Sequence, residues 1–276
     1  MYTISEVKKR CKEGRFFPYS DWFDRIFVPP SIILVWICIN LKISANFVSW
    51  ISALFAIAAA ILISNQNPIN ILIGTSLYLF YYLLDYVDGA VARFNKTSGV
   101  SGQYMDWIMH VISSVAIMCG IAIGALNSSG SWLIPFCILG VAASVLTYAR
   151  HSMAWFSLIM EVQQRMSKNL NLNKIELNES ISSKSNIFYE LIRKIISKIY
   201  HEETLLFLLP ILAILNLYVS NTYIDFRVVL IIGAGTLYFT IMVVEINNLA
   251  SRNKIQEAYN KLFIEKDKPN LPDDHF

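Results

Sequence analysis

The sequence predicts an all-helical integral membrane protein with six transmembrane helices and an amphipathic helix on the membrane surface before the first span. The first reason is composition: 55% of the 276 residues are hydrophobic and 16% are charged, against about 45–50% and about 25% in soluble domains. The second is that the hydrophobic residues form runs close to the ~17–25 residues that a membrane-crossing helix needs. The third is that the basic residues lie on one side of these runs. This composition excludes disordered, collagen-like and disulfide-stapled proteins.

Residues 1–46 are expected to form a cytoplasmic N-terminus that contains the surface helix. The stretch 21–40 is amphipathic at its start, as in helices that lie in the membrane interface. We expect Pro29 and Pro30 to break this helix, because proline removes a helical hydrogen bond and clashes with the preceding turn. The apolar piece that follows, residues 31–41, is too short to cross the membrane.

Six apolar runs follow and form the predicted membrane domain, residues 47–248. They cover residues 47–64, 69–84, 107–126, 132–156, 204–220 and 227–246. The second and fifth are short enough to be buried helices of a soluble protein, but their place in an unbroken series favours six spans. A cytoplasmic loop at about 157–203, which contains a basic amphipathic stretch, and a cytoplasmic tail at 249–276 complete the expected organisation.

The lysines and arginines orient this bundle. If the N-terminus is cytoplasmic, all but one of the 23 basic residues fall in the N-terminal segment, in the connections 85–106 and 150–203, or in the tail. The exception is Arg227. Because cytoplasmic loops hold the positive charge of membrane proteins, we expect both termini inside, in a bacterial inner (plasma) membrane. The net charge of +3 is small, so the basic residues are expected to face anionic lipid rather than nucleic acid.

Four ionisable side chains interrupt the end of the second run and the start of the third. Asp85 and Asp88 are three residues apart, and Asp106 and His110 are four apart, so on helices each pair shares one face. A short connection makes the two helices antiparallel neighbours. The sequence therefore predicts that three carboxylates and an imidazole converge at the cytoplasmic end of the bundle.

Such a cluster predicts a divalent cation. A charged side chain costs on the order of 2.5–3.5 kcal/mol at the membrane midplane and less near a span end, and repulsion among the carboxylates adds to that cost. Mg²⁺ or Mn²⁺ suits carboxylate oxygens, and Mg²⁺ leaves coordination positions open for phosphate oxygens. The small side chains of Gly89 and Ala92 leave space beside the acids, and the guanidinium of Arg93 can bind a phosphate. A lone aspartate at a span end is usually interfacial, but two pairs on facing helices favour a metal site.

These residues resemble the signature of the CDP-alcohol phosphatidyltransferase family. Seven of its eight fixed positions are present with every gap matching, and His110 stands where the family has its fourth aspartate. The seven are Asp85, Asp88, Gly89, Ala92, Arg93, Gly102 and Asp106. Residues 43–50 also resemble the start of the family's first span, with Ala45 and Ser49 as departures. The six-span layout and the surface helix are similar to the family as well.

The resemblance implies a reaction and a homodimer. In that family a substituted phosphate passes from a CDP-activated alcohol, such as CDP-diacylglycerol, to an acceptor hydroxyl, and CMP leaves, in phospholipid or related glycolipid biosynthesis. By resemblance, Asp85, Asp88 and Asp106 hold one or two Mg²⁺ or Mn²⁺ ions on the diphosphate. Asp106 and His110 then act in catalysis. The expected nucleotide site is lined by Gly89, Ala92, Arg93 and Gly102, with Asn46 as a further candidate.

His110 is the departure with a chemical consequence. The family's fourth acid is taken to deprotonate the acceptor alcohol, and imidazole, with a reference pKa of ~6.5 against ~3.9 for aspartate, is intrinsically the better base near neutrality. It also removes one negative charge from the site. We hypothesise that His110 is the base and that a second metal is held weakly. The alternatives are a histidine that only caps the site by hydrogen bonding, or a catalytically inactive homologue that acts as a binding subunit.

Other polar positions have two interpretations each. Asn46 can reach the nucleotide or cap its helix. Arg150 and His151 can bind an anionic acceptor, although positive-inside anchoring explains Arg150 equally well. Glu245 can be interfacial or pair with a basic residue. An ion-coupled transporter is a different functional class that also places acids in spans, but it predicts repeated halves and polar positions at mid-membrane, whereas here the acids cluster at one end and no repeat is found.

Overall fold

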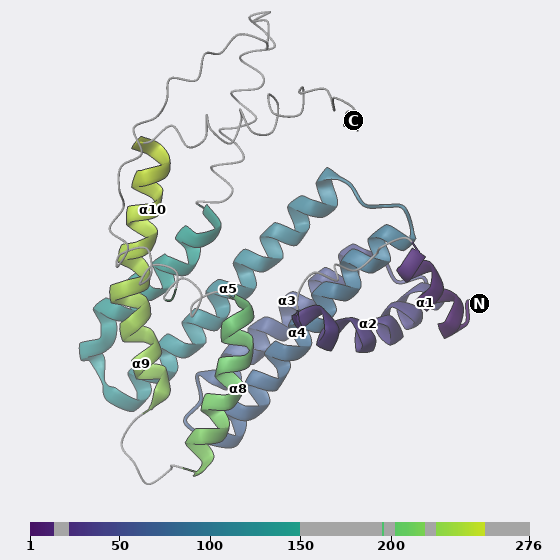
Figure 1. Ribbon diagram of the computed structural model, residues 1–276. Coiled ribbons are helices and arrows are strands. Elements are labelled where there is room, and N and C mark those ends of the chain that lie inside the picture. The colour runs from purple at the N-terminus through teal and green to yellow at the C-terminus, as the bar shows by residue number, and fades with distance from the viewer. Residues whose placement is uncertain (14–21, 150–194, 196–201, 219–224, 252–276) are drawn as a thin grey trace, which may run out of the picture.

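The computed structural model describes residues 1–13, 22–149, 195, 202–218 and 225–251, and all regular structure in that part of the chain is helical (Figure 1). The elements in chain order are α1 (Ile4–Glu13), α2 (Trp22–Asn40), α3 (Ala45–Ile63), α4 (Pro68–Phe94), α5 (Val100–Ser129), a helical segment Ser131–Ala149 that begins with the 3₁₀ turn η1 (Ser131–Leu133), α8 (Glu202–Tyr218), α9 (Phe226–Gly233), the π-helical turn η2 (Ala234–Tyr238) and α10 (Phe239–Ser251). Nearly all of the expected loop and tail lies outside the described residues.

Four helical segments are long and apolar enough to cross a membrane. They are Ala45–Ile63, Tyr104–Ser129, Ser131–Ala149 and Phe226–Asn247, and they coincide with the first, third, fourth and sixth predicted spans. The second predicted span lies within α4. The described part of the fifth, residues 204–218, lies in α8, whose apolar part, Thr204–Leu215, is shorter. The expectation of an all-helical chain with membrane-length helices is therefore confirmed for four spans.

The predicted break at Pro29 and Pro30 is wrong, because α2 runs continuously through both prolines. Both rings lie on the exposed face of the helix, where the carbonyl groups that lose a helical donor can be hydrated. The opposite face buries Val28, Ile32 and Val35 in a cluster that includes residues of α4. This packing offsets the ~3 kcal/mol that a proline costs inside a helix.

Helix α1 covers the junction of α2 and the C-terminal end of α4. Its Val7 is fully buried in the cluster of α2 and α4. The indole Nε1 of Trp36 donates a hydrogen bond of 2.7 Å to the carbonyl of Tyr2 just before the helix, and the guanidinium of Arg10 lies 5.4 Å from the ring centroid of Phe94. The N-terminal segment thus packs beside the end of α4 that carries Arg93.

Helix α3 is the central element, since it packs closely against both α4 and α5 (Figure 1). Small residues permit this approach: a Cβ on Gly120 would lie 2.5 Å from the carbonyl oxygen of Ala60, and one on Gly74 would lie 2.9 Å from that of Ala59. Among the described helices, the backbones of α4 and α5 do not pack closely against each other. The two helices are neighbours as expected, but they meet through side chains: both rest on α3, and Tyr81 of α4 contacts His110 and Ser113 of α5.

Arg227 joins the start of α9 to the connection between α3 and α4. Its side chain is buried and donates hydrogen bonds to the backbone carbonyls of Ile63 and Asn65 at 2.6 and 2.7 Å. It also pairs with the carboxylate of Asp225, the N-cap of α9, at 2.6 Å. Burial by itself would raise the pKa of Asp225, but the hydrogen bonds and charge of Arg227 outweigh it and hold that pKa below its ordinary value.

Replacing Arg227 by methionine should strongly destabilise the protein, because the change leaves the Asp225 carboxylate and two backbone carbonyls without their cationic partner. We expect the free energy of unfolding in detergent to fall by about 3–5 kcal/mol. The matched control is Arg25→Met, which removes an exposed arginine and should change stability by no more than about 0.5 kcal/mol. Equal losses in the two variants would contradict a structural role for the Arg227 cluster.

Candidate active site

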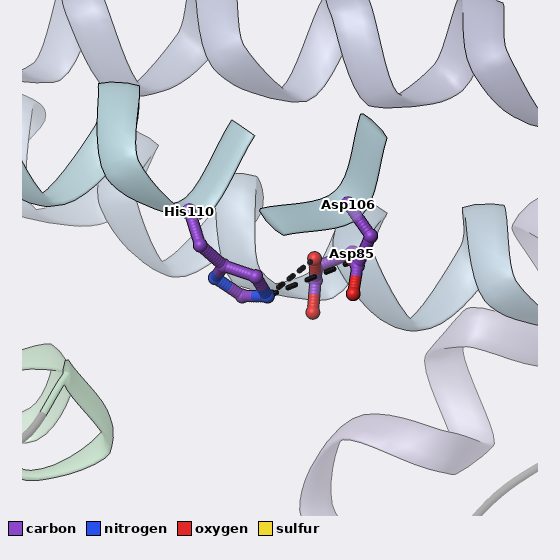
Figure 2. A group of neighbouring side chains, drawn as sticks. All are labelled: Asp85, Asp106 and His110. Carbon is purple, nitrogen blue, oxygen red and sulfur yellow. Dashed lines mark ion pairs between the residues drawn. The ribbon is translucent and has the colours of Figure 1, made fainter. Parts of the chain in front are cut away.

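Three of the predicted site residues meet between α4 and α5. Asp85 lies near the C-terminal end of α4, and Asp106 and His110 lie in the first turns of α5. One ligand atom from each lies within 4.8 Å of the others. Figure 2 shows Nε2 of His110 directed at both carboxylates, 3.4 Å from Oδ1 of Asp85 and 3.7 Å from Oδ1 of Asp106. All three side chains are partly exposed, so a substrate can reach them.

Asp88 is held differently from the other two acids. The residue is 6% exposed, and its carboxylate accepts a short hydrogen bond from the hydroxyl of Ser49 on α3. It lies outside the group of three ligand atoms, although it interacts electrostatically with Asp85 and Asp106. The sequence had identified Ser49 only as a departure from a family pattern, and the structure shows it as the partner of a predicted metal ligand.

The second nitrogen of His110 faces into the protein. Its Nδ1 lies 3.2 Å from the hydroxyl of Tyr81 on α4, and that hydroxyl lies 2.7 Å from Oγ of Ser113 on α5. The ring of Tyr148 stacks against the imidazole with centroids 6.3 Å apart and planes 13° from parallel. Sequence reasoning missed all three residues. Two spacings carried a signal: Tyr81 is four residues before Asp85, and Ser113 is three residues after His110, so each shares a helical face with a predicted site residue.

The predicted nucleotide-binding residues lie along the same end of α4 and α5. Gly89 permits a close approach of Arg93, because a Cβ there would lie 2.9 Å from the guanidinium Nη2. A Cβ on Gly102 would meet nothing within 4 Å, so this position borders open space. Ala92 is partly buried, and Asn46 is exposed in the first turn of α3.

The structure decides some of the alternatives left open by the sequence. Ser44 is the N-cap of α3, since its hydroxyl accepts a hydrogen bond from the backbone N–H of Phe47, so Asn46 is not the cap. Glu245 on α10 is 9% exposed and is therefore a buried residue. Arg150 and His151 lie outside the described residues.

A comparison with known families matches this end of the chain. The sequence model of the CDP-alcohol phosphatidyltransferase family covers residues 42–182, which is half of the 276 residues and includes all eight signature positions. The chain belongs to the CDP-alcohol phosphatidyltransferase family. The match begins just before α3 and includes α4, α5 and the segment Ser131–Ala149. A search of curated proteins finds none that matches.

The donors present in this family member fit a divalent cation. Two carboxylates and an imidazole from two helices converge on one point, and a third carboxylate, that of Asp88, lies buried beside them. Carboxylate oxygens are the preferred ligands of Mg²⁺ and Mn²⁺. Unneutralised, these like charges would repel one another at the end of an apolar bundle.

Asp85→Asn should weaken Mn²⁺ binding, because it removes one full charge and one ligand oxygen from the centre of the group. Loss of a residue that only hydrogen-bonds to a metal ligand weakens metal binding about 10–100-fold. Loss of a ligand itself should raise the dissociation constant further. The measurement is titration of detergent-solubilised protein with Mn²⁺, with free ion followed by electron paramagnetic resonance. Glu6→Gln, which removes an exposed carboxylate on α1, is the control and should bind as the wild type does. Equal affinities in the two variants would show that Asp85 is not a ligand.

Proposed function

We propose that this protein transfers a substituted phosphate from a CDP-activated alcohol to an acceptor hydroxyl and releases CMP. The observation that carries the proposal is the group of Asp85, Asp106 and His110, within 4.8 Å of one another, in a member of the CDP-alcohol phosphatidyltransferase family. Phosphoryl transfer is accelerated mainly by positioning and charge neutralisation. Clustered carboxylates with a cation, a guanidinium and a base supply both.

Each predicted residue has a role in this proposal. Asp85, Asp88 and Asp106 would hold one or two Mg²⁺ or Mn²⁺ ions, which neutralise charge on the diphosphate of the donor when bound. Ser49 fixes the carboxylate of Asp88 by hydrogen bonding. The nucleotide would lie along Gly89, Ala92, Arg93, Gly102 and Asn46, with the guanidinium of Arg93 on a phosphate oxygen.

The reaction is a displacement at the phosphorus atom that carries the alcohol of the donor. The acceptor oxygen bonds to that phosphorus, the bond from phosphorus to the bridging diphosphate oxygen breaks, and CMP leaves with the electron pair. The proton of the acceptor hydroxyl passes to Nε2 of His110. Nε2 is suited to this role because it faces the carboxylates that would position the donor.

The proposed membrane arrangement has six spans, with both termini and the active site in the cytoplasm. Support for the two shorter spans comes from packing, because α4 lies against the membrane-length helix α3 on one side and against α8 on another. The placement of basic residues supports the orientation. We further propose a homodimer in a bacterial inner (plasma) membrane, in line with the family resemblance.

CDP-diacylglycerol is the proposed donor, and the acceptor stays unassigned. A lipid donor with a soluble acceptor and a soluble donor with a lipid or glycan acceptor both fit the same group of carboxylates. The products would be phospholipids or related glycolipids.

Purified protein should release CMP from CDP-diacylglycerol in the presence of Mn²⁺ and a mixture of polyol and amino-alcohol acceptors. Chelation of the metal should abolish release, and Asp88→Asn should lower the rate at least about 100-fold, since the ligand charge is lost. Ser129→Ala, an exposed position at the opposite end of α5, serves as the active control. Absence of metal-dependent CMP from any CDP-alcohol would overturn the proposal in favour of a binding subunit or an ion-coupled transporter.

His110→Ala should lower CMP release by about 10²–10⁴-fold, the usual contribution of a general base. His110→Asp restores the family residue and should remain active. This variant should reach half-maximal rate at a lower Mn²⁺ concentration than the wild type, because the added negative charge strengthens binding of a second Mn²⁺ ion. A rate unchanged in His110→Ala would contradict the assignment of His110 as the base.

A further inference from the structure

Helix α1 precedes the residues that the family model matches, and it is fixed on the protein by contacts before and within the helix. The carbonyl of Tyr2 accepts hydrogen bonds of 2.7 Å from Nε1 of Trp36 and 3.1 Å from Nδ2 of Asn40. Within the helix, Val7 and Cys11 are fully buried in a cluster that includes residues of α4. These contacts determine the place of a ten-residue helix, which would be marginal in isolation.

Two consecutive residues of α1 meet the last two residues of α4. The guanidinium carbon of Arg10 lies 5.4 Å from the ring centroid of Phe94 and 4.8 Å from that of Tyr2, and these two rings meet edge to face. The next residue, Cys11, is close enough to Arg93 for the two to interact electrostatically. A cation over aromatic rings stabilises such a contact, so Arg10 holds α1 against the end of α4 beside Arg93.

The surroundings of Arg93 come from both helices. Burial raises the pKa of the Cys11 thiol to about 11, so near neutral pH this side chain is an uncharged, small apolar group. The guanidinium of Arg93 lies against Gly89, where a Cβ would be 2.9 Å from Nη2, and it interacts electrostatically with Asp88 and Asp106. Arg93 is also exposed, so a substrate can reach its guanidinium beside the acids.

A guanidinium that is already fixed binds a phosphate better than a mobile one. An arginine side chain carries large rotamer entropy, and its loss on binding lowers affinity. If folding has already fixed the side chain, binding no longer incurs this loss. Gly89 leaves room for the guanidinium of Arg93 but has no side chain to restrict it. Contact with α1 can supply the restriction.

We propose that α1 positions the guanidinium of Arg93 for the diphosphate of the CDP-alcohol, and that Arg10 is the residue that fixes α1 for this role. The inference rests on the proposed function, in which Arg93 binds a phosphate oxygen. It extends the binding site to a segment outside the matched residues 42–182. Arg10 does not contact the substrate in this arrangement, because its guanidinium lies on the rings of Tyr2 and Phe94. Arg10 is therefore a positioning residue.

The direct test is the mobility of the Arg93 side chain, measured by ¹⁵N relaxation of arginine-labelled protein in detergent with Mg²⁺. The Arg93→Lys variant identifies the Nε signal of Arg93. We expect this signal to be rigid in the wild type and its order parameter to fall below about 0.6 in Arg10→Ala. The matched control is Lys8→Ala, which removes an exposed positive charge from the same helix and should keep the wild-type order parameter.

Nucleotide binding gives the second readout. Arg10→Ala should raise the KM for CDP-diacylglycerol and the dissociation constant of CMP by about 2–10-fold, the effect of one mobile side chain that must be ordered on binding. The kcat and the Mn²⁺ affinity should stay close to the wild type, because the metal ligands and the base are unchanged. Lys8→Ala should alter none of these values. Arg10→Lys keeps a cation over the rings and should lie closer to the wild type than Arg10→Ala.

A double-mutant cycle shows whether α1 acts through Arg93. Arg93→Ala by itself should weaken CMP binding, and the addition of Arg10→Ala should weaken it no further. Independent effects of the two substitutions would mean that Arg10 acts by another route.

The inference would be overturned by a rigid Arg93 side chain in Arg10→Ala, by equal losses of CMP affinity in Arg10→Ala and Lys8→Ala, or by independent effects in the cycle. A parallel loss of Mn²⁺ affinity in Arg10→Ala would overturn it too, since it would indicate general disruption of the site. Absence of CMP release from the wild type with any CDP-alcohol would instead overturn the proposed function. The mobility of Arg93 would still decide whether α1 fixes that side chain.

Discussion

The contact of α3 with both α4 and α5 is the constraint on which the rest of the structure depends. The contact requires glycine at two positions. The backbone of Ala60 leaves no room for a Cβ on Gly120, and that of Ala59 leaves almost none for a Cβ on Gly74. Without a hydrophobic driving force between helices in lipid, close packing of small residues is a main source of association. Because α4 and α5 both rest on α3, this packing sets how far Asp85 lies from Asp106 and His110.

The two ends of this bundle use charge in opposite ways. At one end, three carboxylates and an imidazole are brought together and fit a cation. At the other end, roughly 25 Å away along the 17 residues from Pro68 to Asp85, Arg227 neutralises Asp225 and binds the carbonyls that end α3. Arg227 was the one basic residue that the charge distribution left on the outside, and its burial explains the exception. It is a structural cross-link rather than a topological signal.

Histidine at the family's fourth aspartate position changes what the surrounding protein must provide. A carboxylate needs no control of tautomer, whereas a neutral imidazole presents a donor on one nitrogen and an acceptor on the other. The structure places a buried tyrosine hydroxyl at Nδ1 and an aromatic ring against the imidazole plane. His110 thus contacts α4 through Tyr81 and the segment Ser131–Ala149 through Tyr148.

The sequence by itself determined the helical class, four membrane-length helices, the family and the pairing of acids on two helices, because composition and short spacings are local properties of the chain. Tertiary structure decided which groups meet. Ser49 and Asp88 are 39 residues apart, and Tyr81 and His110 are 29 apart, so no local pattern could pair them. The continuity of α2 through Pro29 and Pro30 was likewise decided by packing on α4. Contacts between distant residues depend on how the helices are held, and α3 holds them.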